Sequence, residues 1–342
     1  LGANRFGLNL VKRLRAEMTG IIIVKQGTEF MELESGVYAL HPKKASDYEA
    51  LFHKLRQTDR FPEKIIHLWS INEKSVPAGE NSSELANAGF YSLLYTAKAV
   101  GKENHRGKLQ IFVIANNTQA LTGVETIVAE KATIIGPCKV IPQEFPWITC
   151  KFIDLSLPEP ESFQENSLLE SLRREIFSES TETVVAYRGT ERWVEVYQRI
   201  PLFCFKKHTE ELSPNPPLQL KEKGTYLITG GLGKIGMHIA RNLAGVLKAN
   251  LILIGRSVIP DRTEWERWMA SHDPNDATCR KIIGIKELEA LGATVLVLAS
   301  DLSNPKQLAE LIDQAEAKLG RINGIIHAAG ITDAKPIMEI TK

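Results

Sequence analysis

The chain has 342 residues, a formal net charge of +1, 43% hydrophobic residues and 24% charged residues. This length is sufficient for two domains of ordinary size, and the composition is ordinary for a soluble globular protein. The near-zero charge excludes the strong basic field that would favour nucleic acid or an anionic membrane as a partner. The apolar runs are far shorter than the ~20 residues that a membrane-spanning helix needs.

The N-terminus and the cysteines indicate a reducing compartment. No signal peptide is visible, so we expect a cytoplasmic protein. The cysteines have neither CxxC nor Cys/His spacing, so we expect free thiols and no metal site at Cys138, Cys150, Cys204 and Cys279. No basic stripe with interleaved aromatic residues occurs, so we expect no nucleic-acid partner.

Strand-like and helix-like segments alternate along residues 1–207, which predicts an α/β domain. The expected elements, in chain order, are a helix over 7–14, strands over 21–24 and 65–70, a helix over 85–100, strands over 109–115 and 149–155, and one or two closing strands within 184–196. Residues 208–223 contain the run SPNPP and little apolar content, so we expect a linker there and a second domain over 224–342.

The second domain opens with the sequence TYLITGGLGKIG, an apolar run that ends in a glycine loop and continues into a helical pattern. Its glycines have the G-x-G-x-x-G spacing of dinucleotide sites: Gly231 for a tight turn, Gly233 for close approach to a pyrophosphate, and Gly236 for packing of helix on strand. The positive N-terminus of the helix would face the phosphates. The candidate cofactor-binding residues here are Thr229, Gly231, Leu232, Gly233, Lys234, Ile235 and Gly236.

An arginine follows the next expected strand, 251–254, at the position where NAD-preferring sites carry an acidic residue. The planar guanidinium of Arg256 can stack on adenine and bind a 2′-phosphate, with Ser257 beside it. This pattern favours NADPH over NADH. The alternative is a surface arginine that merely ends a strand.

A third expected strand, 294–299, is followed by an aspartate. Asp301 could accept a hydrogen bond from the adenine amino group, while the N–H of Leu302 reaches a ring nitrogen. Alternatively, Asp301 caps the helix that starts near Asn304, and the two roles are compatible.

A fourth expected strand lies within 325–330 and ends in small residues that would let the backbone approach the cofactor ribose: Ala328, Ala329 and Gly330. The alternative is close packing of a helix on the strand. His327 precedes them, and we expect a buried, hydrogen-bonded core histidine because its counterpart His67 lies in a half without a cofactor site.

The two halves repeat one pattern. Residues 7–14 (GLNLVKRL) match 236–243 (GMHIARNL) in their glycine and apolar positions, and 65–70 (IIHLWS) match 325–330 (IIHAAG). We therefore expect two tandem, Rossmann-like, doubly wound halves. The first is degenerate because it has no full glycine loop, and the second is truncated at its C-terminal side. Both ends of the pattern look cut, since the first half lacks its first strand and the second stops after its fourth.

The motifs TGGLGKIG, GRS, DLS and HAAG, in this order and spacing, resemble the short-chain dehydrogenase/reductase superfamily. Residues 261–265 (DRTEW) and 286–293 (KELEALGA) resemble more narrowly the ketoreductase domain of modular polyketide synthases. Residues 62–69 and 132–155 resemble the structural subdomain of those ketoreductases, so the resemblance covers essentially the whole chain.

This resemblance implies a reaction and its partners. A ketoreductase of this kind transfers hydride from NADPH to a β-ketoacyl chain tethered by phosphopantetheine to an acyl carrier protein, and gives a β-hydroxyacyl chain. Other domains of the synthase, a multifunctional enzyme, are the further partners. The alternative is a non-catalytic pseudo-ketoreductase that serves as a scaffold module of the synthase.

The resemblance assigns no catalytic residue to this chain. The family's proton-donating tyrosine, its serine and the supporting lysine and asparagine all belong C-terminal to the HAAG strand, beyond Lys342. We therefore expect the fragment alone to be inactive. One stereochemical class carries Leu-Asp-Asp just after HAAG, whereas this chain has Thr332, Asp333 and Ala334, and the alanine favours the other, A-type class.

Overall fold

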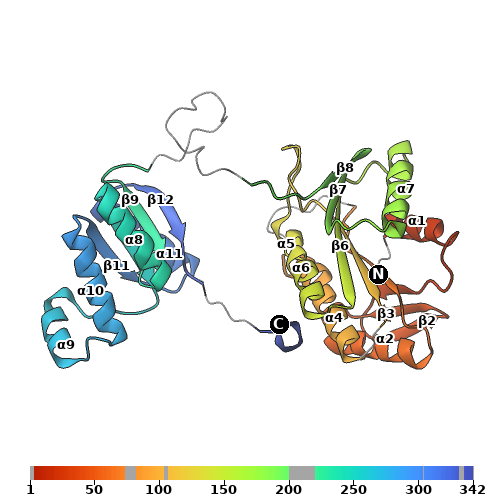
Figure 1. Cartoon of the computed structure of the whole chain (residues 1–342), viewed down its shortest axis with the longest axis horizontal. Coiled ribbons are helices and arrows are strands. Elements are labelled where there is room, and N and C mark those ends of the chain that lie inside the picture. Colours follow the sequence, from red (N-terminus) through yellow and green to blue (C-terminus); the bar gives the residue numbers. More distant parts are fainter. Residues whose placement is uncertain are drawn as a thin grey trace. The chain divides into compact units, whose positions relative to one another are not determined.

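Two units, each with its own strands, divide the chain (Figure 1). The computed structural model describes residues 4–73, 82–103, 107–199, 220–302, 304–330 and 335–341. Unit 1 comprises Leu1–Arg199 together with Ala334–Lys342, and unit 2 comprises Ile200–Asp333. An α/β architecture is confirmed in both units.

Unit 1 contains a five-stranded sheet of order β4-β5-β6-β7-β8 and a three-stranded sheet of order β1-β3-β2. Its strands are β1 (Ile23–Gln26), β2 (Met31–Glu34), β3 (Val37–Leu40), β4 (Lys64–Ser70), β5 (Leu109–Asn116), β6 (Ile148–Leu155), β7 (Val184–Arg188) and β8 (Glu191–Val194). Its helices are α1 (Arg5–Leu14), α2 (Ala45–Gln57), α3 (Ser82–Ala86), the π-helix η1 (Asn87–Tyr91), α4 (Ser92–Lys102), α5 (Ala129–Ala132), α6 (Ile135–Glu144), α7 (Phe163–Phe177) and the 3₁₀ turn η4 (Ile337–Glu339). Strands β4 to β7 are parallel, and β8 closes the sheet as an antiparallel hairpin.

Helices cover both faces of the five-stranded sheet. Strand β5 is almost entirely apolar (LQIFVIAN), as expected of a parallel strand with no solvent-exposed face. One apolar core joins it to α2, α4 and α6, and a second core, on the opposite face, joins the sheet to α1 and α7 (Figure 1). The degenerate half therefore has a complete core although it has no glycine loop.

Two local features of unit 1 differ from the sequence expectation. The strand expected over 21–24 forms as β1, but it pairs with β3 in the smaller sheet, and the β2–β3 hairpin was not predicted because β2 is exposed and polar. The helix expected over 85–100 is interrupted by the π-helix η1. There the Ser92 hydroxyl lies 2.6 Å from both the Ala88 carbonyl and Nε2 of His67, and this side-chain bonding accompanies the widened turn.

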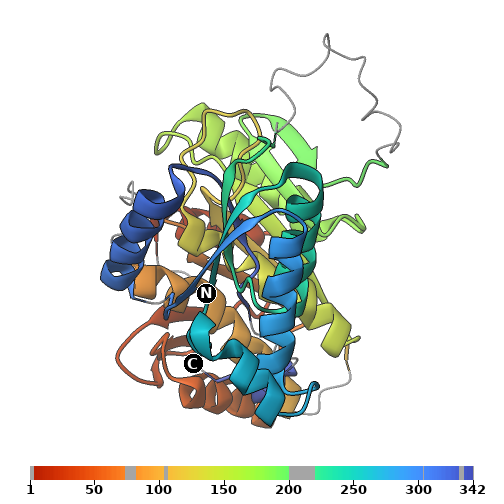
Figure 2. The same ribbon diagram turned by 90° about the vertical axis from the view of Figure 1, so that its left-hand side faces the viewer.

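Unit 2 is a parallel sheet of order β11-β10-β9-β12. Its elements are β9 (Thr225–Thr229), α8 (Lys234–Leu247), β10 (Asn250–Gly255), the 3₁₀ turn η3 (Arg262–Glu264), α9 (Trp265–Ser271), α10 (Ala277–Ala290), β11 (Thr294–Ala299), α11 (Pro305–Leu319) and β12 (Ile322–His327). Helices α8 and α10 cover one face and α11 covers the other (Figure 2). This is the doubly wound arrangement that the sequence predicts.

The boundaries of the units depart from the expected ones. Most of the linker expected over 208–223 lies outside the described residues, and the second domain expected over 224–342 does not keep its last residues. The segment 335–341 belongs to unit 1, where Ile337 is 1% exposed in the core that includes α4 and α6. The Ile337 N–H donates to the Glu144 carboxylate at 2.7 Å, and Lys98 donates to the Ile340 carbonyl at 2.9 Å.

Candidate functional site

The carboxyl ends of the four parallel strands of unit 2 bring the predicted site segments to one edge of the sheet. Backbone hydrogen bonds join these ends to one another. The Gly230 N–H donates to the Ile254 carbonyl at 2.7 Å, and the Ala328 N–H donates to the Thr229 carbonyl at 3.1 Å. The Ser300 N–H donates to the carbonyl at the end of β10 at 3.0 Å. The loops after β9, β10, β11 and β12 therefore form one surface.

The glycine loop is too tight for side chains. A Cβ on Gly231 would lie 2.8 Å from the Leu253 side chain, and a Cβ on Gly236 would overlap the Gly230 carbonyl. The left-handed backbone of the turn belongs to Gly230, with φ of +65°, and not to Gly231, to which we assigned the tight turn. Gly230 was missed because it lies outside the G-x-G-x-x-G spacing, although the doubled glycine was the signal for it.

Helix α8 begins at this loop with its N-terminus open. Its N-cap is Gly233, which offers no side-chain cap, and the first turn carries no acidic residue. Gly233, Lys234 and Ile235 are exposed, whereas Gly236 is buried against the loop. The first N–H groups of a helix have no intrahelical acceptor, so this end is suited to an anion.

Two cationic side chains, those of Arg256 and Lys281, lie at the loop after β10. Arg256 is exposed, and no ion pair joins it to any residue in the described part of the chain. Ser257 accepts a hydrogen bond from Nζ of Lys281 at 2.8 Å. Lys281 was not predicted, because it comes from α10 and carries no sequence mark that links it to this loop.

The loop after β11 presents Asp301 exposed and Leu302 half-buried. The capping role that we considered for Asp301 belongs to Asn304, whose side chain accepts from the Gln307 N–H at 3.3 Å at the start of α11. The backbone carbonyl of Asp301 accepts from the Asn304 N–H at 3.2 Å. The Asp301 side chain therefore does not serve as the N-cap of this helix.

Thr229 connects the end of β9 to the end of β12. Its Oγ1 lies 2.7 Å from Nδ1 of His327 and accepts from the Ala329 N–H at 3.4 Å. Ala328 and Ala329 are half-buried and Gly330 is exposed, so small residues do border the loop. The expectation of a buried His327 was wrong, since its side chain is exposed on β12, which pairs with β9 alone among the described strands.

His67, the counterpart of His327, is a core residue. It is 0% exposed, and burial lowers its pKa to about 3. The helix N-terminus of the first half also differs from that of the second. At α1, Asn4 accepts from the Gly7 N–H at 2.8 Å, and the Glu73 carboxylate accepts from the Phe6 N–H at 2.9 Å. The anion position of this half is thus held by the chain's own carboxylate.

Comparisons with known proteins match two regions of the chain to protein families. The family described as "KR domain" matches residues 224–342, and the family described as "Beta-ketoacyl synthase-like, N-terminal" matches residues 6–175. Polyketide synthase PksM of Bacillus subtilis (strain 168) is 32% identical over 179 residues, which are 51% of this chain and 4% of that protein. 6-Methylsalicylic acid synthase of Aspergillus terreus is 39% identical over 124 residues, 35% of this chain and 7% of that protein.

Residues 224–342 thus match the KR domain family, and the relatives that resemble the chain are polyketide synthases. The chain also resembles a solved structure of adenylation, ketoreductase and pseudo Asub domains from a keto acid-selecting NRPS module. The match has a TM-score of 0.78 and 26% identity, and it covers 99% of this chain and 27% of that one. An N-terminal ketoreductase from a macrolactin assembly line has the same fold, with a TM-score of 0.74 and 24% identity over 99% of this chain and 61% of that one.

The remaining expectations concern partners and ions. None of the helices in the described ranges is both long and apolar enough to cross a membrane. Within those same ranges, no group of three or more His, Cys, Asp or Glu side chains is placed to hold a metal ion. Cys138, Cys150 and Cys279 are buried free thiols, and Cys204 lies outside the described residues.

Proposed function

We propose that this ketoreductase uses NADPH to reduce a β-ketoacyl chain, carried by phosphopantetheine on an acyl carrier protein, to the β-hydroxyacyl chain. The observation that supports the proposal most strongly is the N-terminus of α8, which follows a glycine loop and has no side-chain cap. Arg256 follows the neighbouring strand β10, at the position where NAD-preferring sites carry an acidic residue. The family supports a role in ketoreduction within a polyketide or nonribosomal peptide synthase module.

Each predicted segment has a part in this proposal. The residues from Thr229 to Gly236 would hold the pyrophosphate through backbone N–H groups, and Arg256 with Lys281 would bind the 2′-phosphate. Asp301 and Leu302 would contact the adenine. The small residues from Ala328 to Gly330 would border the ribose. Bound NADPH would supply the hydride, and the chain's own residues would orient the cofactor and neutralise its phosphates.

The partners are likewise inferred from the proteins that the chain resembles. The chain spans only 4% and 7% of the length of two synthases that it matches, so the reaction of a whole synthase is an extension from them. We propose the acyl carrier protein and the neighbouring synthase domains as partners in the cytoplasm. The A-type stereochemistry stays a prediction, because Ala334 lies outside the described residues.

The proposal is tested by titrating the chain with NADPH and with NADH and following cofactor fluorescence. We expect NADPH to bind at least about tenfold more tightly, because a charge-assisted contact to the 2′-phosphate contributes about 1.5–3 kcal/mol. Arg256→Ala should remove most of this preference and leave only the smaller contribution of Lys281. Arg321→Ala is the matched control, because Arg321 is exposed and directly precedes β12 at the opposite edge of the sheet.

Two results would contradict the proposal. Equal affinity for NADPH and NADH would show that Arg256 does not bind the 2′-phosphate. No binding of either cofactor, by this chain or by the intact synthase that contains it, would favour the scaffold alternative. In the intact synthase, Arg256→Ala should also slow NADPH oxidation with a β-ketoacyl thioester.

A further inference from the structure

The two described thiols of unit 1, those of Cys138 and Cys150, lie in contact. Cys138 is on α6 and Cys150 is on β6, and the helix packs on this strand (Figure 1). The Cys138 side chain hydrogen-bonds the Cys150 thiol, and this contact, together with burial, raises the pKa of Cys150. The two residues are 4% and 5% exposed and belong to one apolar core. Two free thiols in contact are the reactants that an intramolecular disulfide requires.

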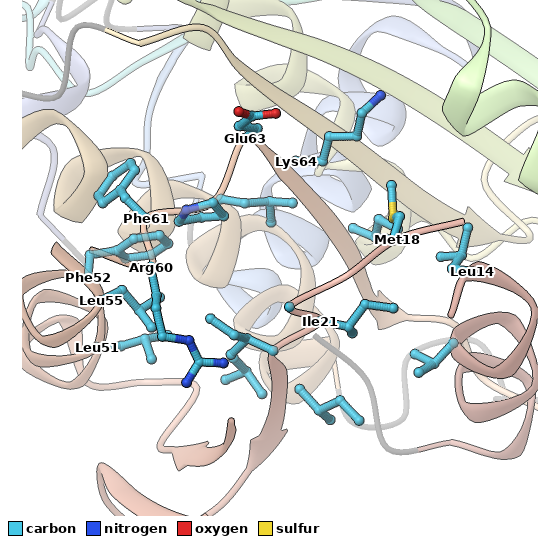
Figure 3. Close-up of a pocket in the computed structure, with 18 of the residues that line it drawn as sticks. Leu14, Met18, Ile21, Leu51, Phe52, Leu55, Arg60, Phe61, Glu63 and Lys64 are labelled. Carbon is cyan, nitrogen blue, oxygen red and sulfur yellow. The ribbon is translucent and has the colours of Figure 1, made fainter. Parts of the chain in front are cut away.

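The closed core protects both thiols from reagents in solution. The raised pKa of Cys150 keeps it as the thiol, whereas the thiolate is the nucleophile. An apolar groove of about 610 Å³ opens into the same core, where Leu51, Phe52 and Leu55 of α2 line it (Figure 3). Neither cysteine lines this groove, and no residue of α6 does. The groove gives a reagent no direct path to the pair, so we assign access to movement of α6.

The backbone of α6 is weakly bonded around Cys138. The helix, IGPCKVIPQE, contains Gly136, Pro137 and Pro142. Pro142 has no N–H to donate to the Cys138 carbonyl four residues earlier, and the Cys138 N–H donates to the Ile134 carbonyl at the long distance of 3.3 Å. Glycine and internal proline are also the residues that disfavour a helix most. The helix is therefore suited to open locally and expose its thiol while the sheet stays paired.

We propose that Cys138 and Cys150 are a redox-sensitive pair that forms a reversible disulfide between α6 and β6 by exchange with a low-molecular-weight disulfide such as oxidised glutathione. The Cys138 thiolate of the opened helix attacks oxidised glutathione, which forms a mixed disulfide and releases one glutathione thiolate. Cys150 then loses its proton and attacks Sγ of Cys138, which forms the protein disulfide and releases the second glutathione thiolate. Two protein thiols are oxidised by two electrons, one glutathione disulfide is reduced, and the two thiol protons pass to the released glutathione.

The disulfide would act as a clamp on this core. It closes the short loop from α6 to β6, so it restricts the same local opening that allows it to form. In a reducing compartment, reduced glutathione returns the pair to two thiols. The clamp would therefore respond to a rise in the oxidised fraction of the glutathione pool.

Tryptic peptide mapping of the folded chain after incubation with oxidised glutathione tests the proposal. Trypsin places the two thiols in different peptides, residues 132–139 and 140–151. We expect these peptides to be joined in most of the protein, and dithiothreitol to separate them. Hydrogen exchange at the α6 amides should become at least about tenfold slower in the oxidised protein. Cys279 is the matched control, because it is also buried but has no thiol among the groups that shift its pKa, and it should remain free.

Two variants separate this pair from general oxidation of the chain. Cys150→Ala should give no linked peptides and no added protection of α6, because the second thiol is removed. Pro142→Ala keeps both thiols and adds the N–H that the Cys138 carbonyl lacks. We therefore expect the linkage to form at least about tenfold more slowly in Pro142→Ala than in the wild-type chain.

Several outcomes would overturn the proposal. Glutathione adducts without linked peptides, or linkage that forms only in urea, would show that the folded chain does not join the two thiols. Equally fast linkage in Pro142→Ala would show that opening of α6 does not control access. Linkage without slower exchange at α6 would contradict the clamp. Exchange at the β5 amides reports that unit 1 is folded in each sample.

Discussion

Helices α1 and α8 occupy equivalent places in the two units, but their N-termini are satisfied in opposite ways. At α1 the chain supplies its own acceptors, from Asn4 and Glu73, and Arg5 pairs with Glu73 at 3.7 Å and with Glu165 at 2.8 Å. At α8 the cap is Gly233, without a side-chain acceptor, and the first turn has no acid. One copy of the repeat thus has side-chain acceptors at the N-terminus of its helix, whereas the cap and first turn of the other helix supply none.

The largest expected effect comes from closing the α8 loop with a side chain. A Cβ at Gly236 would meet the Gly230 carbonyl and would lie 2.7 Å from the Gly231 Cα, so Gly236→Val must displace the loop. We expect NADPH affinity to fall at least about 100-fold, because several charge-assisted contacts of about 1.5–3 kcal/mol each would be lost. Calorimetric titration measures this loss.

Gly245→Ala is the control on the same helix. A Cβ at Gly245 would meet no atom within 4 Å apart from the nearby backbone of its own helix, so this change should leave NADPH affinity intact and stabilise the helix by up to about 1 kcal/mol. Unchanged NADPH binding by Gly236→Val would show that the ligand does not use this loop, and the contrast between α1 and α8 would then lose its functional meaning.

The next largest effect is expected from His67, which is buried, in contrast to its exposed counterpart His327. Burial lowers the pKa of His67 to about 3, whereas an unfolded histidine binds a proton below about pH 6.5. The unfolded state therefore binds more protons between these values, and the free energy of unfolding should decrease as the pH falls, by up to about 1.4 kcal/mol per pH unit. Urea unfolding between pH 7 and 5, followed by tryptophan fluorescence, measures the slope.

His67→Gln should flatten this slope, even if it lowers stability at pH 7, because the titrating group is removed. His327→Gln is the matched control, since His327 is exposed on β12. An unchanged slope in His67→Gln would assign the acid sensitivity of unit 1 to other groups.

Glu73→Gln would make α1 resemble α8. The carboxylate that accepts from the Phe6 N–H becomes neutral, so we expect the free energy of unfolding of unit 1 to fall by about 0.5–1 kcal/mol. Added sulfate should restore part of this loss, because an anion could then occupy the helix N-terminus. The same substitution at exposed Glu29 should do neither. If sulfate stabilised Glu73→Gln no more than the wild-type protein, the carboxylate would not be standing in for an anion.

The smallest effect is expected at Lys281, which donates to Ser257 from α10. Lys281→Ala should weaken NADPH binding by about threefold and leave NADH binding unchanged, because an exposed charge contributes about 0.2–1 kcal/mol. Lys286→Ala, an exposed lysine on the same helix, is the control. An equal loss of affinity for NADPH and NADH would show that Lys281 supports the conformation of the loop and does not contact the 2′-phosphate.

The candidate cofactor edge of unit 2 could be predicted because parallel strands bring their carboxyl ends together. The glycine spacing and the residues after each strand were therefore enough to place Thr229, Arg256, Asp301 and Ala328 on one surface. The sequence could not place Lys281, because its role depends on how α10 packs against the sheet.

Other features could not be predicted because they depend on tertiary packing, which the local sequence does not determine. The exposed, charged β2 has no apolar alternation, so the pattern of residues did not indicate a strand. His67 and His327 occupy the same place in similar strands, but β4 is buried in unit 1 and β12 is half-exposed in unit 2. A sequence repeat can therefore predict the fold of both copies without predicting the environment of either histidine.

The burial of Ile337 makes unit 1 discontinuous along the chain. Its first segment ends at Arg199, and its last begins at Ala334, so unit 2 is inserted between two segments of one core. During synthesis the ribosome must complete all of Ile200–Asp333 before Ile337 can reach that core. The core of unit 1, although translated first, is therefore completed only after all of unit 2 has been translated.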